Sequence, residues 1–290
     1  MDRFTVGKAT IHRVEEMAAP MPLAMFGQDL VARNADWLYP HWANAPVPGA
    51  EATWDMVVQS WIVVVDGQVV VVDPCVGNGR SLPHFPLFDK LDTPFIERFA
   101  ATGIRPEQVD FVFCTHLHSD HCGWNTTLRD GRFVPTFPKA RYLLAQRELD
   151  RWNPALPGYR HVPENAGIFA ASVAPVIKAG LVDVVGETHR ISPSLKTQPA
   201  YGHTLGHSVV HLDSMGHEAW FTGDVFHHPI ELIHPEIDAG TCDDFAQTLA
   251  TRRRLIDRFV ASGALIVPAH FVAPHVGRLR ASNGRRVFEW

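Results

Sequence analysis

The chain has 290 residues, of which 46% are hydrophobic and 20% are charged, as in ordinary soluble globular proteins. Its formal net charge of −5 argues against a nucleic-acid partner, because phosphate binding requires a clustered basic face. The N-terminus lacks an apolar signal segment, and no apolar stretch is long enough to cross a membrane, so we expect a cytoplasmic protein with no membrane partner. Histidine, with 17 copies, is unusually frequent.

Hydrophobic patterns predict strands that come in hairpins and helices that follow them at intervals. The predicted strands are 56–65, 68–73, 109–114, 141–145, 181–185, 208–213, 218–222 and 264–268. The predicted helices are 93–102, capped by Thr93, then 146–152 and 243–262. Asp66-Gly67 between the first two strands is typical of a tight hairpin turn. This order favours helices packed outside two sheets.

The segment 18–50 differs from the rest of the chain. It is rich in proline and aromatic residues and has little periodicity. Long loops of this kind are usually functional or form interfaces. We therefore interpret it as an N-terminal extension that lies near the active site or at the interface of a homodimer.

Four metal-binding side chains directly follow the predicted strand 109–114. They are His116, His118, Asp120 and His121. Neutral imidazole and carboxylate are ligands that zinc and similar divalent ions prefer. His116 and His118 are two residues apart in an extended segment and therefore point to the same side. Asp120 and His121 can then serve a second position, so the cluster predicts two metals rather than one.

Three later segments place similar side chains at the ends of predicted strands. His203 and His207 precede the strand 208–213, Asp224 follows 218–222, and His270 follows 264–268. Each segment alone is a weak signal, whereas the four together are a strong one.

Two other features of the sequence do not predict a functional site. Cys75, Cys114, Cys122 and Cys242 have no C-x-x-C spacing, which predicts neither a zinc knuckle nor a disulfide framework. The basic run Arg252-Arg253-Arg254 lies within a helical pattern and is interpreted as a solvated helix face.

The motifs, in this order, resemble the metallo-β-lactamase superfamily: His-x-His-x-Asp-His at 116–121, Gly-His-Thr-x-Gly-His at 202–207, then a late Asp and His. The resemblance implies one α/β domain over residues 1–290, an αββα sandwich with two mixed sheets flanked by helices. It assigns His116, His118 and His203 to one metal, Asp120, His121 and His270 to the other, and Asp224 as the bridge. His207 is expected to support the ligands, although sequence alone does not separate it from His203.

The same resemblance implies two divalent ions that generate a hydroxide nucleophile, with Asp120 moving a proton to the leaving group. Zinc is the expected metal, while iron, manganese and cobalt accept the same ligands.

Within the superfamily, the chain is similar to the N-acyl-homoserine lactonase and methyl-parathion-hydrolase branch, through its extension and the segments 73–78 and 118–124. Typical homoserine lactonases place a tyrosine three residues after the bridging aspartate. Here that position is His227, which can donate a hydrogen bond to the substrate instead. Ser119 likewise replaces an aromatic residue that is common there.

The expected function is a metal-dependent hydrolase that opens a lactone or cleaves a hydrophobic carboxylic ester. The alternatives are a phosphotriester hydrolase, then a β-lactam hydrolase or a non-catalytic ligand-binding member of the fold. The substrate pocket is predicted to be lined by Ser119, Trp124, Phe226 and Phe271, with Met21, Phe26, Trp37 or Trp42 contributed by the extension. An apolar wall of this kind suits a small, neutral, hydrophobic substrate.

Overall fold

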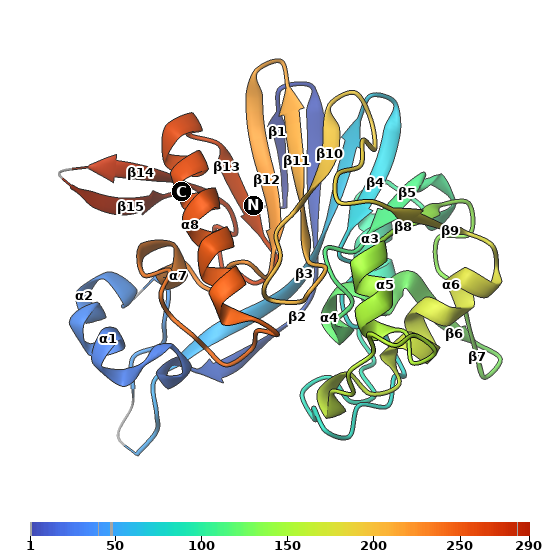
Figure 1. The fold of residues 1–290 in the computed structure, drawn as a ribbon, viewed down its shortest axis with the longest axis horizontal. Helices are drawn as coiled ribbons and strands as arrows, with labels where there is room; N and C mark the ends of the chain where they lie inside the picture. The colour runs from blue at the N-terminus through green and yellow to red at the C-terminus, as the bar shows by residue number, and fades with distance from the viewer. Residues whose placement is uncertain (1, 40, 47–48, 283) are drawn as a thin grey trace.

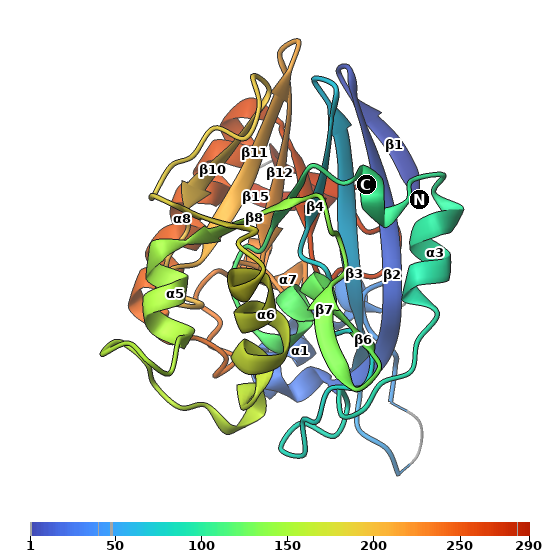
Figure 2. The same cartoon turned by 90° about the vertical axis from the view of Figure 1, so that its right-hand side faces the viewer.

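The computed structural model describes residues 2–39, 41–46, 49–282 and 284–290 (Figure 1). Two large sheets pack face to face, with helices outside them (Figure 2). The predicted αββα sandwich with two mixed sheets is therefore confirmed. The residues of the extension numbered 40, 47 and 48 lie outside the described part of the chain, as do 1 and 283.

The seven-stranded sheet contains the N-terminal half of the chain, in the order β1-β2-β3-β4-β5-β8-β9. Its strands are β1 (Arg3–Val6), β2 (Ala9–Pro22), β3 (Thr53–Val65), β4 (Gln68–Val72), β5 (Phe111–Phe113), β8 (Arg141–Ala145) and β9 (Val182–Val185). Pairing is antiparallel from β1 to β4 and parallel from β4 onward. Asp66 and Gly67 both have positive φ, 55° and 76°, as the predicted hairpin turn requires.

The six-stranded sheet contains the C-terminal half, in the order β10 to β15. Its strands are β10 (Leu195–Pro199), β11 (Ser208–Ser214), β12 (His217–Gly223), β13 (Leu265–Pro268), β14 (Gly277–Ser282) and β15 (Arg285–Glu289). Only the β12–β13 pair is parallel among these described strands. A separate hairpin joins β6 (Thr126–Arg129) to β7 (Arg132–Pro135).

Helices cover the outer faces and one end of the sandwich. The α-helices are α1 (Gln28–Arg33), α2 (Ala35–Leu38), α3 (Phe95–Ala101), α4 (Ser119–Cys122), α5 (Gln146–Trp152), α6 (Ala174–Lys178), α7 (Ile230–Ile233) and α8 (Phe245–Ser262). Short 3-10 turns are η1 (Leu23–Phe26), η2 (Pro106–Gln108), η3 (Gly123–Asn125) and η4 (Pro163–Asn165), and η5 (Phe169–Val173) is a π-helical turn that leads into α6. In Figure 2, α8 lies outside the six-stranded sheet and α3 outside the seven-stranded one.

Two layers of apolar side chains hold these elements together. Trp61, Phe113 and Phe221 belong to the layer between the sheets. A second layer lies beneath the helices and the extension, and it includes Trp42, Phe99 and Phe259. Burial of this apolar surface is the main term that stabilises such a fold.

The prediction of an extension at residues 18–50 was wrong for its first residues. Residues 18–22 of the predicted extension are the end of β2, which pairs with β3 as far as Pro22 and Thr53. A register shift between Glu15 and Met17 breaks the alternation of side chains that would have revealed this strand.

Thr93 does not cap α3. Pro94 occupies the cap position, and the Thr93 hydroxyl instead donates to Glu16 at 3.0 Å. Among the described residues, no helix combines the length and apolar character needed to cross a membrane.

Candidate metal centre

Four segments that are far apart in the sequence meet at one end of the sandwich. Asp224 and His270 follow β12 and β13, which run parallel and therefore end side by side. The segment 202–207 precedes β11, which is antiparallel to β12 and so begins at the same end. The Ser208 N–H donates to the Thr115 carbonyl at 2.9 Å and ties this segment to the one after β5.

The first group of ligand atoms consists of three imidazole nitrogens and one carboxylate oxygen, all within 4.8 Å of one another. Nδ1 of His118 lies 3.0 Å from Nε2 of His116 and 2.9 Å from Nε2 of His203. Oδ2 of Asp224 lies 3.4 Å from Nε2 of His203 and 3.8 Å from Nε2 of His116. These four atoms can surround a single cation.

The second group consists of Asp120, His121 and His270. Oδ2 of Asp120 is 3.6 Å from Nε2 of each histidine. Oδ1 of Asp224 lies 3.2 Å from Nε2 of His121 and 3.0 Å from Nε2 of His270. The two oxygens of Asp224 therefore face different groups, which is the arrangement of a bridging carboxylate.

Partners behind the ligands fix how the imidazoles are oriented. The carboxylate of Asp73 lies 3.1 Å from Nδ1 of His121 and accepts hydrogen bonds from the Thr115 N–H at 2.7 Å and hydroxyl at 2.8 Å. Nδ1 of His270 is 2.8 Å from the Val57 carbonyl. Such contacts leave Nε2 of each ring free to face a metal. Asp73 follows β4 just as the ligands follow their strands, a signal that sequence reasoning did not use.

His207 has a different place from His203. Its Nε2 accepts a hydrogen bond from the Asp224 N–H at 3.1 Å, whereas Nε2 of His203 faces the first ligand group. The preceding residue, Gly223, has a φ of 49°, and a Cβ there would lie 2.5 Å from Oγ1 of Thr115 and 2.7 Å from Nε2 of His207. Only glycine adopts this positive φ readily and also has no Cβ to clash with these two side chains. Gly223 therefore allows Asp224 to lie against the cluster.

The protonation states and the unpaired atoms fit divalent cations. Burial lowers the pKa of His118 to about 4, which leaves its ring neutral and able to bind a metal. Burial alone would raise the pKa of Asp224, but His121 and His270 lower it well below the usual value, so it is ionised. Oδ1 of Asp224 and Nε2 of His121 are buried polar atoms without a hydrogen bond in the described part of the chain. A bound cation would satisfy both.

His121 carries a proton that a metal has to displace. Burial lowers its pKa, but Asp224, Asp120 and Asp73 outweigh burial and raise the pKa well above the ordinary value. Metal binding at the second group therefore releases a proton.

His227 lies beside the cluster and lines a cavity. Its Nε2 is 3.3 Å from Oδ2 of Asp224, and its Nδ1 is 3.5 Å from Oε2 of Glu231. Burial lowers the pKa of His227, but these two carboxylates outweigh it and raise the pKa to about 10. The ring is thus a cation held by two carboxylates.

Arg252 is buried beneath this histidine, in contrast to the predicted solvated face, while Arg253 and Arg254 are exposed. It donates to Glu231 at 2.5 Å and to the Val225 carbonyl at 2.8 Å. Position 252 shares the inner stripe of α8 with Thr248, Leu255 and Phe259, which the apolar pattern alone did not indicate. Glu231 and Arg252 are functional candidates that sequence reasoning missed.

A cavity of about 510 Å³ opens onto the ligands. Its polar side includes His118, Ser119, Asp120 and His227, and its apolar wall consists of Met21, Met25, Trp54, Met56, Phe85 and Phe88. A wider groove of about 790 Å³ lies elsewhere, along β2 and α3, and is lined by Arg13, Arg98 and other surface residues. The smaller cavity is the candidate site, because it contains the ligand cluster.

Three predicted pocket residues lie in the core instead. Trp124 stacks on Phe95 at 5.1 Å between ring centroids and donates to Glu16 at 2.6 Å. Phe226 packs near Phe259, and Phe271 packs near Phe288. Phe226 and Phe271 turn into the core, whereas their chain neighbours His227 and His270 line the cavity.

The extension contributes only one of the four pocket residues expected from it. Met21 lines the cavity, whereas Phe26 and Trp42 are buried in the core and Trp37 packs against that core. Ser119 lines the cavity as expected.

The family model of the metallo-beta-lactamase superfamily matches residues 53–270, which is most of the chain. The chain belongs to this superfamily. The match contains all seven candidate metal ligands, from His116 to His270.

Several solved structures share the fold over nearly the whole chain. AbOPH, a hydrolase of the β-lactamase superfamily, is 20% identical, with a TM-score of 0.79 and coverage of 99% of this chain and 96% of that one. AidC, a dizinc quorum-quenching lactonase in complex with a product, is 16% identical, with a TM-score of 0.77 and coverage of 99% and 95%. An N-acyl homoserine lactone hydrolase, with product at its catalytic metal centre, is 15% identical, with a TM-score of 0.63 and coverage of 92% and 94%.

One curated relative is transcription termination factor FttA of Pyrococcus horikoshii. It is 29% identical over a match of 163 residues, and the match covers 52% of this chain. The matched part is 23% of that relative, so the chain spans only a fraction of its length.

Proposed function

We propose that this member of the superfamily hydrolyses small, hydrophobic carboxylic esters or lactones and depends on two divalent cations. The observation that carries the proposal is the cavity, which joins the ligand cluster on one side to an apolar wall on the other. Two of the structural relatives are lactonases with product bound, which supports this substrate class.

The residues around the cluster have separate roles in the proposed reaction. When bound, divalent cations at such a centre supply Lewis acidity and a lowered pKa of water. Asp120 lines the cavity beside His121 and His270 and is placed to hold a proton and pass it to the leaving oxygen. His227 lines the cavity beside Asp224, and its imidazole is placed to donate to the oxygen on which negative charge develops.

The apolar wall supports a hydrophobic substituent on the substrate. Trp54 and Met56 come from β3, Met21 and Met25 from β2 and η1, and the segment 85–88 closes the other side. Methionine side chains adapt to irregular apolar shapes, so the wall suits an alkyl or aryl group without fixing one shape. Burial of such a group contributes about 25 cal/mol per Å² of apolar surface.

A phosphotriester is the second candidate substrate. The position of His227 suits it as well, because a phosphoryl oxygen also gains negative charge during hydrolysis and could accept a hydrogen bond from the imidazole. Nothing in the apolar wall distinguishes an aryl ester from an aryl phosphotriester.

One experiment tests both candidates. Purified protein is analysed for bound metals, stripped with a chelator, restored with zinc, and assayed on lactones, aryl esters, phosphotriesters and β-lactams. We expect about two ions per chain and hydrolysis of lactones or aryl esters that is lost without metal. Turnover of phosphotriesters alone would establish the second candidate, and no turnover by a fully loaded protein would contradict both.

The contact between the apolar wall and the substrate is tested with the same compounds. Trp54→Ala should raise KM for esters with long or aromatic substituents by about 5- to 30-fold, since loss of a buried aromatic contact costs about 1–2 kcal/mol, and leave acetyl esters nearly unchanged. Equal effects on both kinds of ester would rule out a substrate contact by Trp54.

A further inference from the structure

Glu148 is a fully buried glutamate that lies between two of the ligand-bearing segments. It follows β8, which runs parallel to β5, so the carboxyl ends of both strands lie at the same end of the sheet. The turn into α5 brings its side chain to the segment after β5. The proposed reaction assigns this carboxylate no role.

Both oxygens of the carboxylate accept hydrogen bonds, and the donors come from different segments. Oε2 accepts from the N–H of Leu117, which stands between His116 and His118, at 3.0 Å. Oε1 accepts from the Gly206 N–H at 2.9 Å and from the Thr204 hydroxyl. Thr204 directly follows the ligand His203.

We propose that Glu148 is a positioning residue of the metal centre, which joins the segment 116–118 to the segment 203–206 and so sets the distance between their imidazoles. The inference rests on the proposed metal centre and extends it to a residue that does not touch the ions. Nδ1 of His118 and Nε2 of His203, one from each segment, are the 2.9 Å pair of the first ligand group.

The packing around Glu148 indicates a residue that joins two segments rather than one that only fills space. A Cβ at Gly206 would collide with the backbone nitrogen of Glu148, so the two segments are in direct contact there. A buried carboxylate is costly unless its oxygens are hydrogen-bonded, and an apolar side chain would fill the same space without that cost. The carboxylate is useful because it binds donors on both segments at once.

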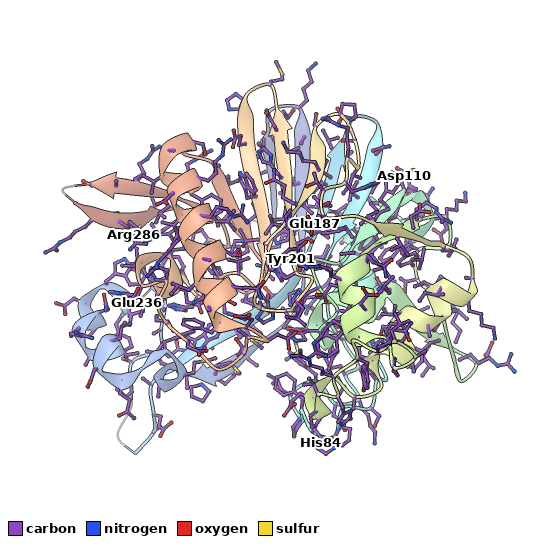
Figure 3. All side chains as sticks on the ribbon, in the orientation of Figure 1. His84, Asp110, Glu187, Tyr201, Glu236 and Arg286 are labelled. Carbon is purple, nitrogen blue, oxygen red and sulfur yellow. The ribbon has the colours of Figure 1, made fainter. Side chains whose placement is uncertain are left out.

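A second link from α5 to the same segment strengthens this arrangement. Arg151 donates to the carboxylate of Asp243 at 2.8 and 2.9 Å, and the Asp243 N–H donates to the His203 carbonyl at 2.9 Å. The guanidinium carbon of Arg147 lies 4.4 Å from the ring centroid of Tyr201, which is labelled in Figure 3. Helix α5 is thus attached to the His203 segment along its length.

The test measures metal affinity in the absence of turnover. Metal-free wild type and Glu148→Gln are titrated with zinc in competition with a chromophoric chelator, and their unfolding by urea is followed in parallel. We expect Glu148→Gln to bind at least one of the two ions about 10- to 100-fold more weakly, the usual effect of losing a group that orients ligands. Glutamine keeps the size of the side chain but replaces one acceptor oxygen with a donor.

Glu16→Gln is the matched control. Glu16 is also a buried carboxylate, and it accepts from the N–H groups of Val76 and Gly77 and from Trp124, none of which is adjacent to a ligand. We expect it to lose stability to urea as Glu148→Gln does while keeping zinc affinity within about 3-fold of wild type, well below the outer-sphere effect. Equal losses of affinity in the two variants would overturn the inference, because a general loss of packing would then explain both.

A milder pair of variants covers the case in which Glu148→Gln does not fold. Thr204→Val removes one donor to the carboxylate, and Thr204→Ser keeps it. Zinc affinity should fall in the first and be preserved in the second. Equal affinity in both would overturn the role of Glu148 while leaving the metal centre intact, whereas a wild type that binds no zinc would overturn the proposed function and the inference together.

Discussion

Asp224 is the residue on which the two ligand groups depend. Its carboxylate faces His121 and His270 with one oxygen and His116 and His203 with the other. Two cations held close together repel each other and need an anion between them. In the proposed dinuclear centre, this single side chain would therefore decide whether two ions are bound.

Asp224→Ala should lower the metal content to one ion or none and abolish hydrolysis. Metal analysis after gel filtration and a steady-state assay check both outcomes. Asp150→Ala, at an exposed carboxylate on α5, is the control and should behave as wild type. A variant that keeps two ions and full kcat would exclude Asp224 as the bridge.

His227 makes a separate contribution. His227→Ala should reduce kcat by about 100- to 1000-fold, the usual effect of removing one oxyanion donor, with both metals retained. The measurement is kcat and KM together with metal content. An unchanged kcat would remove His227 from the mechanism, and a loss of metal would make it a structural support of the centre.

At the scale of elements, helix α8 is connected to the site through a buried arginine. Arg252, on its buried face, binds Glu231, and Glu231 accepts from the N–H groups of His227 and His228 at 2.5 and 3.2 Å. Burial raises the pKa of Glu231, but Arg252 and His227 outweigh burial and lower it to about 2. A helix, a short turn and the candidate oxyanion donor are thus connected through one buried ion pair.

Glu231→Gln should lower the free energy of unfolding by about 3–5 kcal/mol at pH 7, because it leaves Arg252 buried without its partner. In the wild type, the folded-state pKa lies below the unfolded value near 4.5, so this stabilisation is present above pH 4.5 and is lost as the pH falls toward 2. The difference in the free energy of unfolding between wild type and Glu231→Gln should therefore decrease from pH 5 to pH 3 in urea titrations. A difference that stays constant over this range would show that the ion pair is not its cause.

At the scale of the whole molecule, the sandwich brings together ligands that lie up to 154 residues apart in the chain, from His116 to His270. The ends of β5, β12 and β13 and the start of β11 meet at one edge, where both sheets contribute ligands. Cations bound there cross-link the two halves of the fold. Metal binding should consequently stabilise the folded chain as a whole.

Removal of metal with a chelator should lower Tm, and added zinc should restore it in a concentration-dependent way. At free zinc 100 times Kd, one site contributes about 2.7 kcal/mol. Differential scanning calorimetry of wild type and Asp224→Ala over a zinc series checks this. A Tm of the wild type that does not respond to zinc would contradict a metal site that joins the sheets.

Much of the architecture was determined by local patterns in the sequence. The Val-rich hairpin around Asp66-Gly67, the strand and helix at 141–152 and the helix that begins after Asp244 follow from side-chain period and turn chemistry, which act over a few residues. The ligand types were likewise visible, because each ligand follows or precedes a predictable strand. Their division into two groups came from the family resemblance, and the geometry places the same residues together.

The tertiary structure alone decided what surrounds those ligands. Burial of Arg252, the contact of Glu148 with two distant segments and the inward turn of Phe226 and Phe271 depend on which faces meet when the sheets pack. The apolar wall likewise arises where β2 and β3 pass the segment 85–88. Local periodicity determines which side of an element is apolar, but only the packed fold determines whether that side faces core, cavity or solvent.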